Sequence, residues 1–486
     1  MTTDDPPNKH QPDTIDDELA HFRANLRSLD GEIAKTQKHP LKLQAKRASS
    51  QNSVDELGSA HIRRLPTELL VRVFMLTLPM EPSLCHPGAA PLVLGQVCRL
   101  WRAVSRSTPL LWSTIRIEAI KTEEYRVAVL EWLERSCRCP LTVYVEPDGP
   151  KWEILAGIAA RIAHLDIEVD HDEVGQLFSS DGCDSLDSLQ SLHIEITDCW
   201  ECDFEGLQVD LGTRAPQLAR VYVGGGPTFQ HLILPTIQIT ICDICVGDTT
   251  SFMLFFQEAV NLVDCTIRVW DPFRGDVSPQ SPVRHTKLEK LTIRDFQSAN
   301  RNVLASILPC MDLASLREFR WDNRDIFGQY GQDWPIAIFL DFLSRSGCTL
   351  STLWIGCGPA DDDILQYLLE VPSVVDLAIN LGMHCTCSRK LMRALTLGSH
   401  SEPEGKYLVP NVEHLRICGA WSQCEEMMQA IESRFGAVGY TPEGKRLKRV
   451  SLVPSLVYNN RLGHTQGRLD KCVREGLLYD LDFSVE

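Results

Sequence analysis

The sequence has no run of about 18 apolar residues, which is the length that a membrane-spanning helix requires. Its first residues, MTTDDPPNKHQPDT, are polar and acidic and lack the apolar core of a secretory signal peptide. No Asn-x-Ser/Thr glycosylation sequon occurs anywhere in the chain. These absences argue against a membrane protein and against a secreted one. We therefore expect an intracellular protein, located in the cytoplasm, the nucleus or both.

Positive charge is also scarce, because 48 lysines and arginines stand against 65 aspartates and glutamates and leave a net charge of −17. Proteins that bind nucleic acid through its phosphates carry basic faces, so we expect no nucleic-acid partner. The chain also lacks a phosphate-binding glycine loop, a Gly-x-Ser-x-Gly turn and a His-Glu-x-x-His motif. We therefore predict no catalytic residues, no cofactor and no enzymatic activity.

Cysteine, by contrast, is plentiful, with 18 residues. A chain of 486 residues does not need disulfides to fold, so we predict reduced thiols that pack as small apolar groups. Cys199-x-x-Cys202 and Cys242-x-x-Cys245 have the internal spacing of zinc ligands, but 39 residues separate the two pairs. The second pair also falls within a strand-like run. We favour buried thiols over zinc and predict no metal site.

The length exceeds what one compact core usually holds, so we expect two or three units or an extended repeat. Residues 1–13 are predicted to be disordered and residues 40–61 to form a basic polar linker. Between them, residues 14–39 carry apolar side chains at steps of 4, 3, 4, 3 and 4. This spacing predicts a short amphipathic helix resembling a coiled coil, and it leaves self-association and docking to another surface both open.

A different pattern begins at LPTELLVRVF, residues 65–74, where Pro66 and Thr67 favour the start of a helix. A proline-rich loop, residues 79–91, ends this helix. A second short helix is expected over Val93, Val97, Leu100, Trp101 and Val104, and a third at STPLLW, residues 107–112. Helices this short are not stable alone, so they must pack on each other or on a partner.

These residues resemble an F-box, the small all-α module of substrate receptors in SCF-type cullin-RING ubiquitin ligases. The resemblance rests on the Leu-Pro-x-Glu-Leu-Leu start, on Val-Cys-x-x-Trp-Arg and on the closing Leu-Trp. The loop and the preceding helix are similar to those of the expanded F-box families of mushroom-forming fungi. The resemblance implies an F-box over residues 62–117 that binds a Skp-type adaptor and, through it, cullin and RING subunits. The implied adaptor-binding residues are Leu65, Pro66, Leu69, Leu70, Val73, Phe74, Leu92, Val97, Trp101 and Trp112.

From residue 118 onward, one spacing of apolar residues recurs, at positions one, four and six of a six-residue unit. It occurs nine times, from LQSLHI at 189 to LKRVSL at 447, at intervals of 24 to 44 residues. Further units are expected at IAHLDI, 162–167, and at LPTIQI, 234–239. Helix-like stretches lie between the units. Residues 118–486 are therefore predicted to form an irregular leucine-rich-repeat-like α/β solenoid, with a non-repetitive α/β domain as the alternative.

Side chains alternate along a strand, so the fifth residue of each unit should point away from the helices. This outward column contains no acidic residue and predicts a mildly basic strip. We hypothesise that the strip binds an acidic or phosphorylated segment of a protein client, although an ordinary mixed surface fits the flanking columns as well. The column consists of His193, Tyr222, Thr266, Thr292, Arg320, Trp354, Ala378, Arg416 and Ser451. The candidate client-binding residues are Tyr222, Arg294, Arg320, Trp354 and Arg416.

The expected fold is α/β overall, with a short N-terminal helix, a small all-α F-box and a leucine-rich-repeat-like solenoid. The expected function is that of a substrate-recognition subunit of the ligase, which brings a client to the adaptor complex. The alternative is a non-catalytic interaction scaffold that acts outside any ubiquitin ligase.

Overall fold

The protein is described by a computed structural model, and contacts between residues divide the chain into two units. The first unit comprises Met1–Leu78 with Pro91–Thr108, and the second comprises Pro79–Ala90 with Pro109–Glu486. The described residues are 20–31, 65–79, 88–118, 122–146, 152–170, 173, 185–197, 209–225, 231–274, 281–295, 303–323, 335–356, 361–380, 389–397, 408–419, 424–436, 446–454 and 465–481.

Several expectations lie outside the described residues. These are the disordered stretch 1–13, the linker 40–61, most of the loop 79–91, and both Cys199 and Cys202. Part of the expected N-terminal helix is described as a helix over residues 20–31, with all its residues exposed. Its self-association stays a prediction.

The first unit contains three short helices in addition, α2 (Thr67–Leu76), α3 (Ala90–Val97) and α4 (Arg99–Arg106). The carbonyl of Pro66 accepts hydrogen bonds from the amides of Leu69 and Leu70, so α2 begins where the Leu-Pro start predicts. Cys98 separates α3 from α4, and its sulfur accepts a 3.5 Å hydrogen bond from the amide of Trp101. The Phe74 and Trp101 rings lie 4.8 Å apart and form the centre of a small core.

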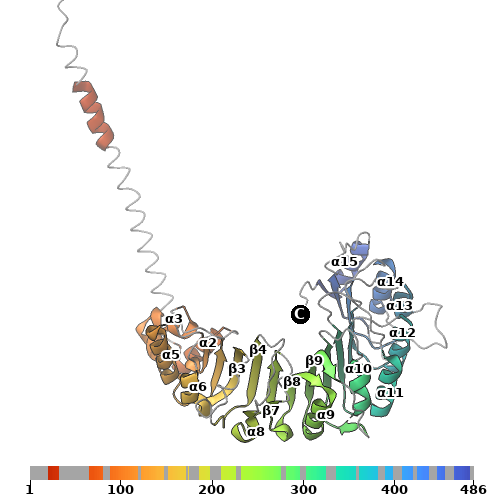
Figure 1. Ribbon diagram of the computed structural model, residues 1–486. Helices are drawn as coiled ribbons and strands as arrows, with labels where there is room; N and C mark the ends of the chain where they lie inside the picture. Colours follow the sequence, from red (N-terminus) through yellow and green to blue (C-terminus); the bar gives the residue numbers. More distant parts are fainter. Residues whose placement is uncertain are drawn as a thin grey trace, which may run out of the picture. The chain divides into compact units, whose positions relative to one another are not determined.

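The second unit is built on one open, fourteen-stranded parallel sheet (Figure 1). Its strands neighbour one another in chain order, which confirms the α/β class. The strands are β1 (Thr114–Ile117), β2 (Leu141–Val145), β3 (Ile162–Asp170), β4 (Ser191–Thr197), β6 (Arg220–Gly224), β8 (Ile241–Asp248), β9 (Asp264–Arg274), β11 (Lys290–Asp295), β13 (Glu318–Asn323), β14 (Thr352–Ile355), β15 (Asp376–Asn380), β16 (His414–Gly419), β17 (Arg449–Pro454) and β18 (Leu478–Leu481).

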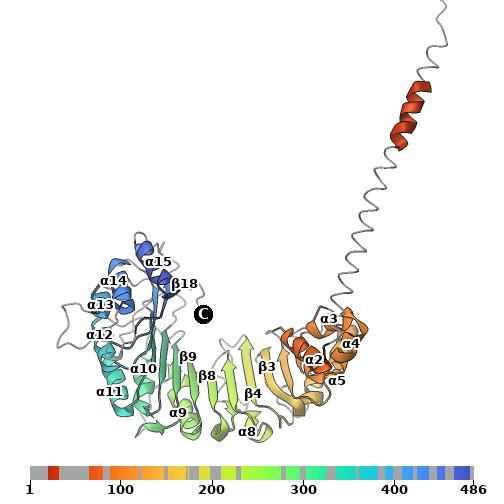
Figure 2. The same ribbon diagram turned by 180° about the vertical axis from the view of Figure 1, so that it is seen from behind.

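Two small parallel pairs accompany this sheet, β5 (Val209–Asp210) with β7 (Leu232–Ile233) and β10 (Val283–His285) with β12 (Met311–Leu313). Figures 1 and 2 show α8 to α14 along one face of the large sheet. The helices of the unit are α5 (Glu123–Arg135), α6 (Trp152–Ile158), α8 (Leu211–Arg214), α9 (Thr249–Glu258), α10 (Val303–Ile307), α11 (Ile336–Ser346), α12 (Asp361–Glu370), α13 (Arg389–Leu395), α14 (Cys424–Phe435) and α15 (Gln466–Arg474).

Burial alternates along the strands as the repeated spacing predicts. The fourth and sixth positions of the nine units are buried on the helix-covered side, as Leu353 and Ile355 in β14 illustrate. The residues between them are at least partly exposed in eight of the nine units, because successive side chains of a strand point to opposite faces. This amphipathic pattern places the main core of the unit between the sheet and its helices.

Three details of the sequence prediction differ from the structure. The unit expected at 234–239 is a short 3₁₀ turn after Pro235, and the strand follows it at β8. Strands β1, β2 and β18 were not anticipated. Trp112 and residues 114–117 were placed in the helical module, but they belong to the second unit, where Trp112 is buried 5.0 Å from the Trp132 ring.

Arginines near helix ends tie successive segments of the second unit together. Arg434 on α14 is 2% exposed and donates three hydrogen bonds, to the carbonyls of Leu395, Leu408 and Val409, at 2.6, 2.7 and 3.0 Å. Burial of the charge lowers the pKa of Arg434 to about 10. Val409 has a positive φ of 38°, which a β-branched residue rarely adopts, so Arg434 holds a strained turn in place. Arg345 on α11 bonds the carbonyls of Leu308 and Met311 in the same manner.

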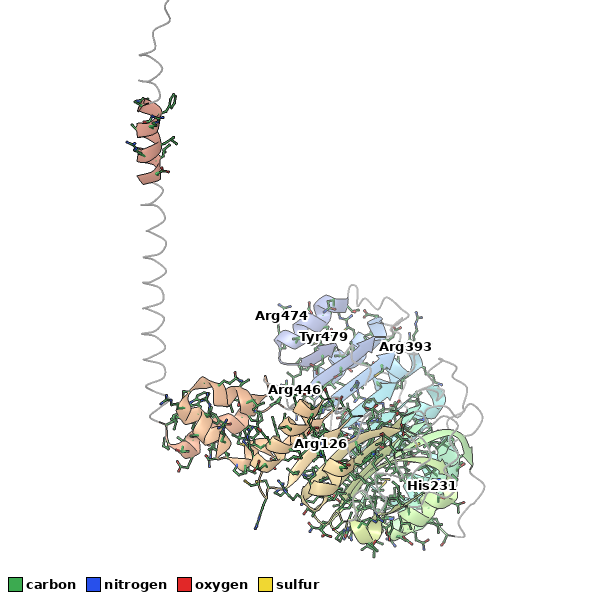
Figure 3. The ribbon with its side chains drawn as sticks, turned by 60° about the vertical axis from the view of Figure 1, so that its left-hand side comes forward. Arg126, His231, Arg393, Arg446, Arg474 and Tyr479 are labelled. Carbon is green, nitrogen blue, oxygen red and sulfur yellow. The ribbon has the colours of Figure 1, made fainter. Side chains whose placement is uncertain are left out.

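We predict that Arg434→Met destabilises the chain by about 3 kcal/mol, because it leaves three buried carbonyls without a donor. Urea unfolding followed by circular dichroism measures the loss. The matched control is Arg474→Met, at an exposed arginine of α15 that Figure 3 labels, with an expected change within about 0.5 kcal/mol. Equal losses in the two variants would contradict the role of Arg434.

Candidate functional site

The candidate site is the face of the large sheet that α8 to α14 leave uncovered, called here the bare face. Its central row contains one outward residue from each strand, and the strand pairing places them all in register. The row consists of Arg116, Tyr144, Asp166, His193, Tyr222, Asp243, Thr266, Thr292, Arg320, Trp354, Ala378, Arg416, Ser451 and Asp480.

All nine residues of the predicted outward column lie in this row, so the predicted alignment is confirmed. The expectation of an acid-free, mildly basic strip is wrong, because Asp166, Asp243 and Asp480 also belong to the row. They come from β3, β8 and β18, which the nine units did not include. The bare face therefore has charge of both signs, and its acids are concentrated on particular strands.

A groove of about 550 Å³ crosses the bare face between β2 and β8. His193 and Tyr222 lie side by side in its wall, with ring centres 3.7 Å apart. Asp166 Oδ2 lies 3.0 Å from Nδ1 of His193 and orients the imidazole. Burial and the nearby Arg220 guanidinium lower the pKa of His164, which also lines the groove. The groove thus combines two imidazoles, two phenols and two carboxylates on neighbouring strands.

Tyr222 is the centre of a hydrogen-bonded network beside the groove. Its hydroxyl donates to Glu195 at 2.9 Å and accepts from Arg268, whose guanidinium carbon lies 4.4 Å from the ring centre. Arg268 also pairs with Asp243 through contacts of 2.8 and 2.9 Å. Burial raises the pKa of the Tyr222 phenol well above its usual value, although Arg268 opposes the rise. The phenol therefore stays protonated and keeps donating to Glu195.

The second cluster lies farther along the row, on β13 to β16. The guanidinium carbons of Arg320 and Arg416 lie 5.4 and 4.8 Å from the Trp354 ring centre. Arg416 is two strands from Trp354, and Ala378 lies between them in the row. Because alanine is small, the arginine side chain can reach across it to the indole. We call Arg320, Trp354 and Arg416 the arginine–tryptophan cluster.

The five candidate client-binding residues therefore do not form one site. Tyr222 lines the groove, and three others form the arginine–tryptophan cluster. Arg294 on β11 lies between them, in register with Arg268 and Asp322, and belongs to neither. Asp166, Asp243 and Arg268 were not among the residues predicted for the site. Only strand register brings them together, although the alternating run ICDICV at 241–246 marked the position of β8.

The predicted adaptor-binding residues divide by burial. Leu70 and Phe74 are 1% and 0% exposed and form the core of the first unit, so they are not available for docking, contrary to expectation. Trp112 is likewise buried, in the second unit. Leu92 and Trp101 are half-buried. The other five predicted residues are exposed, namely Leu65, Pro66, Leu69, Val73 and Val97.

The zinc alternative involved Cys242 and Cys245, which the structure describes. Cys242 faces the helices, where its sulfur lies 3.5 Å from that of Cys265. Cys245 is three residues later in the same strand and so points to the opposite face. The two thiols cannot bind one ion together. The hydrogen bond with Cys265, together with burial, raises the pKa of Cys242, which keeps it as a neutral thiol.

A scan against protein-family models finds no match for this chain, and a search of curated proteins finds none either. None of the helices in the described part of the chain combines the length and the apolar character that crossing a membrane requires.

We predict that Tyr222→Phe destabilises the second unit by about 1–2 kcal/mol, because Glu195 and Arg268 lose a half-buried hydrogen-bond partner. Urea unfolding measures the change. Tyr144→Phe is the matched control on β2, since its hydroxyl makes no hydrogen bond to a described residue, and we expect a change within about 0.5 kcal/mol. Indistinguishable variants would show that the network adds no stability.

Proposed function

We propose that the protein is a substrate-recognition subunit of an SCF-type cullin-RING ubiquitin ligase. The first unit is the F-box, and it binds a Skp-type adaptor. The second unit is an irregular leucine-rich-repeat-like solenoid, and its bare face binds a protein client. The observation that carries the proposal is that α2 has apolar side chains on two adjacent faces, about 100° apart, of which only one is buried.

One face of α2 is already used. Leu70 and Phe74 are buried within the first unit, against α4 and the Trp101 ring. The other face carries Leu69 and Val73, one helical turn apart and 45% and 44% exposed. Apolar side chains aligned along an exposed helix face usually mark a surface that a partner covers.

Other exposed apolar residues occur on neighbouring segments of the first unit. Leu65 and Leu76 lie at the two ends of α2, and Val93, Val97 and Leu100 lie on α3 and α4. Leu65, Leu69, Val73 and Val97 are also among the residues that the F-box resemblance implies for adaptor binding, and this agreement between pattern and exposure supports the proposal. A buried leucine or valine contributes roughly 1.5–3 kcal/mol, so a few such residues suffice for tight binding.

Strand order supports the solenoid. Each strand of the large sheet pairs with the next one along the chain, and the connecting helices lie along one face. This arrangement leaves the opposite face of the fourteen strands without any of the helices α8 to α14. The arginine–tryptophan cluster on that face suits an acidic or phosphorylated segment, because guanidinium groups stacked on an indole still present N–H donors to carboxylates and phosphates.

The proposed receptor acts through proximity and needs no catalytic group. Holding a client beside an adaptor-bound conjugating enzyme raises the effective concentration of the client's lysines near that enzyme. The alternative function is a scaffold outside any ligase, in which the same exposed face of α2 binds a different partner.

We predict that the wild-type chain co-purifies with a co-expressed Skp-type adaptor and that Leu69→Asp combined with Val73→Asp weakens this binding by about 100-fold or more. Two carboxylates in an apolar interface lose the burial energy and remain without partners. Isothermal titration or pull-down with purified adaptor measures the loss.

The matched control is Met75→Asp, which adds the same charge to the same helix. Met75 is 37% exposed but lies roughly 140° around the helix from the Leu69–Val73 stripe. We expect this variant to bind the adaptor as the wild type does. If the wild type itself fails to bind, the F-box assignment is wrong and the scaffold function is favoured.

A further inference from the structure

Charge on the bare face is separated along the sheet. On β1 to β8, counted together with the residues that directly follow β1 and β2, seven described carboxylates stand against two arginines, a net charge of −5 with histidines neutral. We call this part the acidic half. Its carboxylates are Glu118, Glu146, Asp166, Glu168, Asp170, Glu195 and Asp243, and its arginines are Arg116 and Arg220.

On β9 to β18, five described carboxylates stand against six basic residues, a net charge of +1. The carboxylates are Asp264, Glu318, Asp322, Asp376 and Asp480, and the basic residues are Arg268, Lys290, Arg294, Arg320, Arg416 and Arg449. The two parts thus differ by six charges. This difference does not show when the columns beside the central row are counted over the whole sheet at once.

The acidic half contains carboxylates that repel one another. Glu168 and Glu195 are directly opposite on adjacent strands, and Asp170 follows two residues after Glu168 on the same face. Glu195 accepts a hydrogen bond from Tyr222, whereas Glu168 is exposed and has no cationic partner among the described residues. Like charges placed side by side cost stability, and a cationic ligand would remove that cost.

The other half presents its charge differently, at the arginine–tryptophan cluster. Trp354 holds the Arg320 guanidinium against its ring, and Glu318 contacts the same guanidinium at 2.5 Å. The arginine is therefore positioned before any ligand arrives, with its side chain still 42% exposed. Positioned guanidinium groups bind carboxylates and phosphates with less loss of side-chain entropy.

We propose that the bare face binds a single extended client segment whose charges are opposite to those of the face. The segment places cationic side chains over β3 and β4 and anionic side chains over β13 to β16. The proposal rests on the bare face being the client surface of the proposed receptor. Six strand-to-strand steps separate β3 from β13. At about 4.8 Å per step the two ends are about 29 Å apart, which about nine extended residues span.

The probe is a labelled peptide with a block of lysines, a glycine-serine spacer of about nine residues and a block of glutamates. A second peptide has the same composition with the two charges alternating, and a third replaces the glutamates by phosphoserines. Fluorescence anisotropy on the full chain at low salt measures affinity. We expect the separated-block peptide to bind at least about tenfold more tightly than the alternating one. Comparison with the third peptide shows whether carboxylates or phosphates are the better anions.

Two charge-reversal variants locate the ends. Glu168→Lys with Asp170→Lys should abolish binding of a lysine-block peptide and leave a glutamate-block peptide unaffected. Arg320→Glu with Arg416→Glu should do the reverse. Glu370→Lys, at an exposed residue of α12 on the helix-covered side, is the control and should change neither.

Equal affinity for the separated and alternating peptides, or equal effects of both variants on both half-peptides, would overturn the proposal. Adaptor binding by the same variants separates this result from the proposed function. If the crossed pattern is lost while the adaptor still binds, the receptor remains and its client has a different charge pattern. If the crossed pattern appears without adaptor binding, the bipolar surface belongs to a scaffold.

Discussion

The register between neighbouring parallel strands is the constraint on which the rest of the second unit depends. Just before most of the strands, a backbone amide donates to the carbonyl at the equivalent place in the preceding unit, as from Val263 to Thr240 and from Ser351 to Arg317. Serine and asparagine side chains reinforce these positions, including Ser373 to Leu350 and Asn411 to Pro372. A slip of one residue would turn every apolar side chain of a strand away from the helices. The burial of leucine and isoleucine and the alignment of the central row therefore depend on the same register.

This constraint explains how far the sequence alone predicted the structure. Units with apolar residues at all three positions, such as LSTLWI at 350–355, became strands in the predicted register. Strand β8 was misplaced because the neighbouring LPTIQI at 234–239 also has apolar residues at positions one, four and six. Strand β18 begins after Gly476, which has no apolar side chain to complete the pattern. Short-range spacing therefore locates a strand only when all three positions carry an apolar side chain and no neighbouring run has the same spacing.

The site was less predictable than the fold because its contacts join residues that are distant along the chain. Arg268 meets Tyr222 and Asp243 across three strands, and Arg416 meets Trp354 across Ala378. The sequence also could not separate the two roles of apolar residues in α2. Leu70 and Leu69 are adjacent and chemically identical, yet one is buried and the other is exposed. That difference depends on where α4 packs and not on the motif.

Because the strands pair in chain order, the large sheet can be lengthened or shortened by whole strand-and-helix repeats. Each strand of the large sheet pairs only with the strands of adjacent repeats. Adding or deleting one repeat would therefore leave the others with their usual neighbours. One such change between β4 and β13 would move the two charged ends by about 4.8 Å, or about one and a half residues of an extended segment. The number of repeats would then set the spacing between the charges that such a face recognises. Insertion or deletion of a repeat would alter its specificity without substitution of any contact residue.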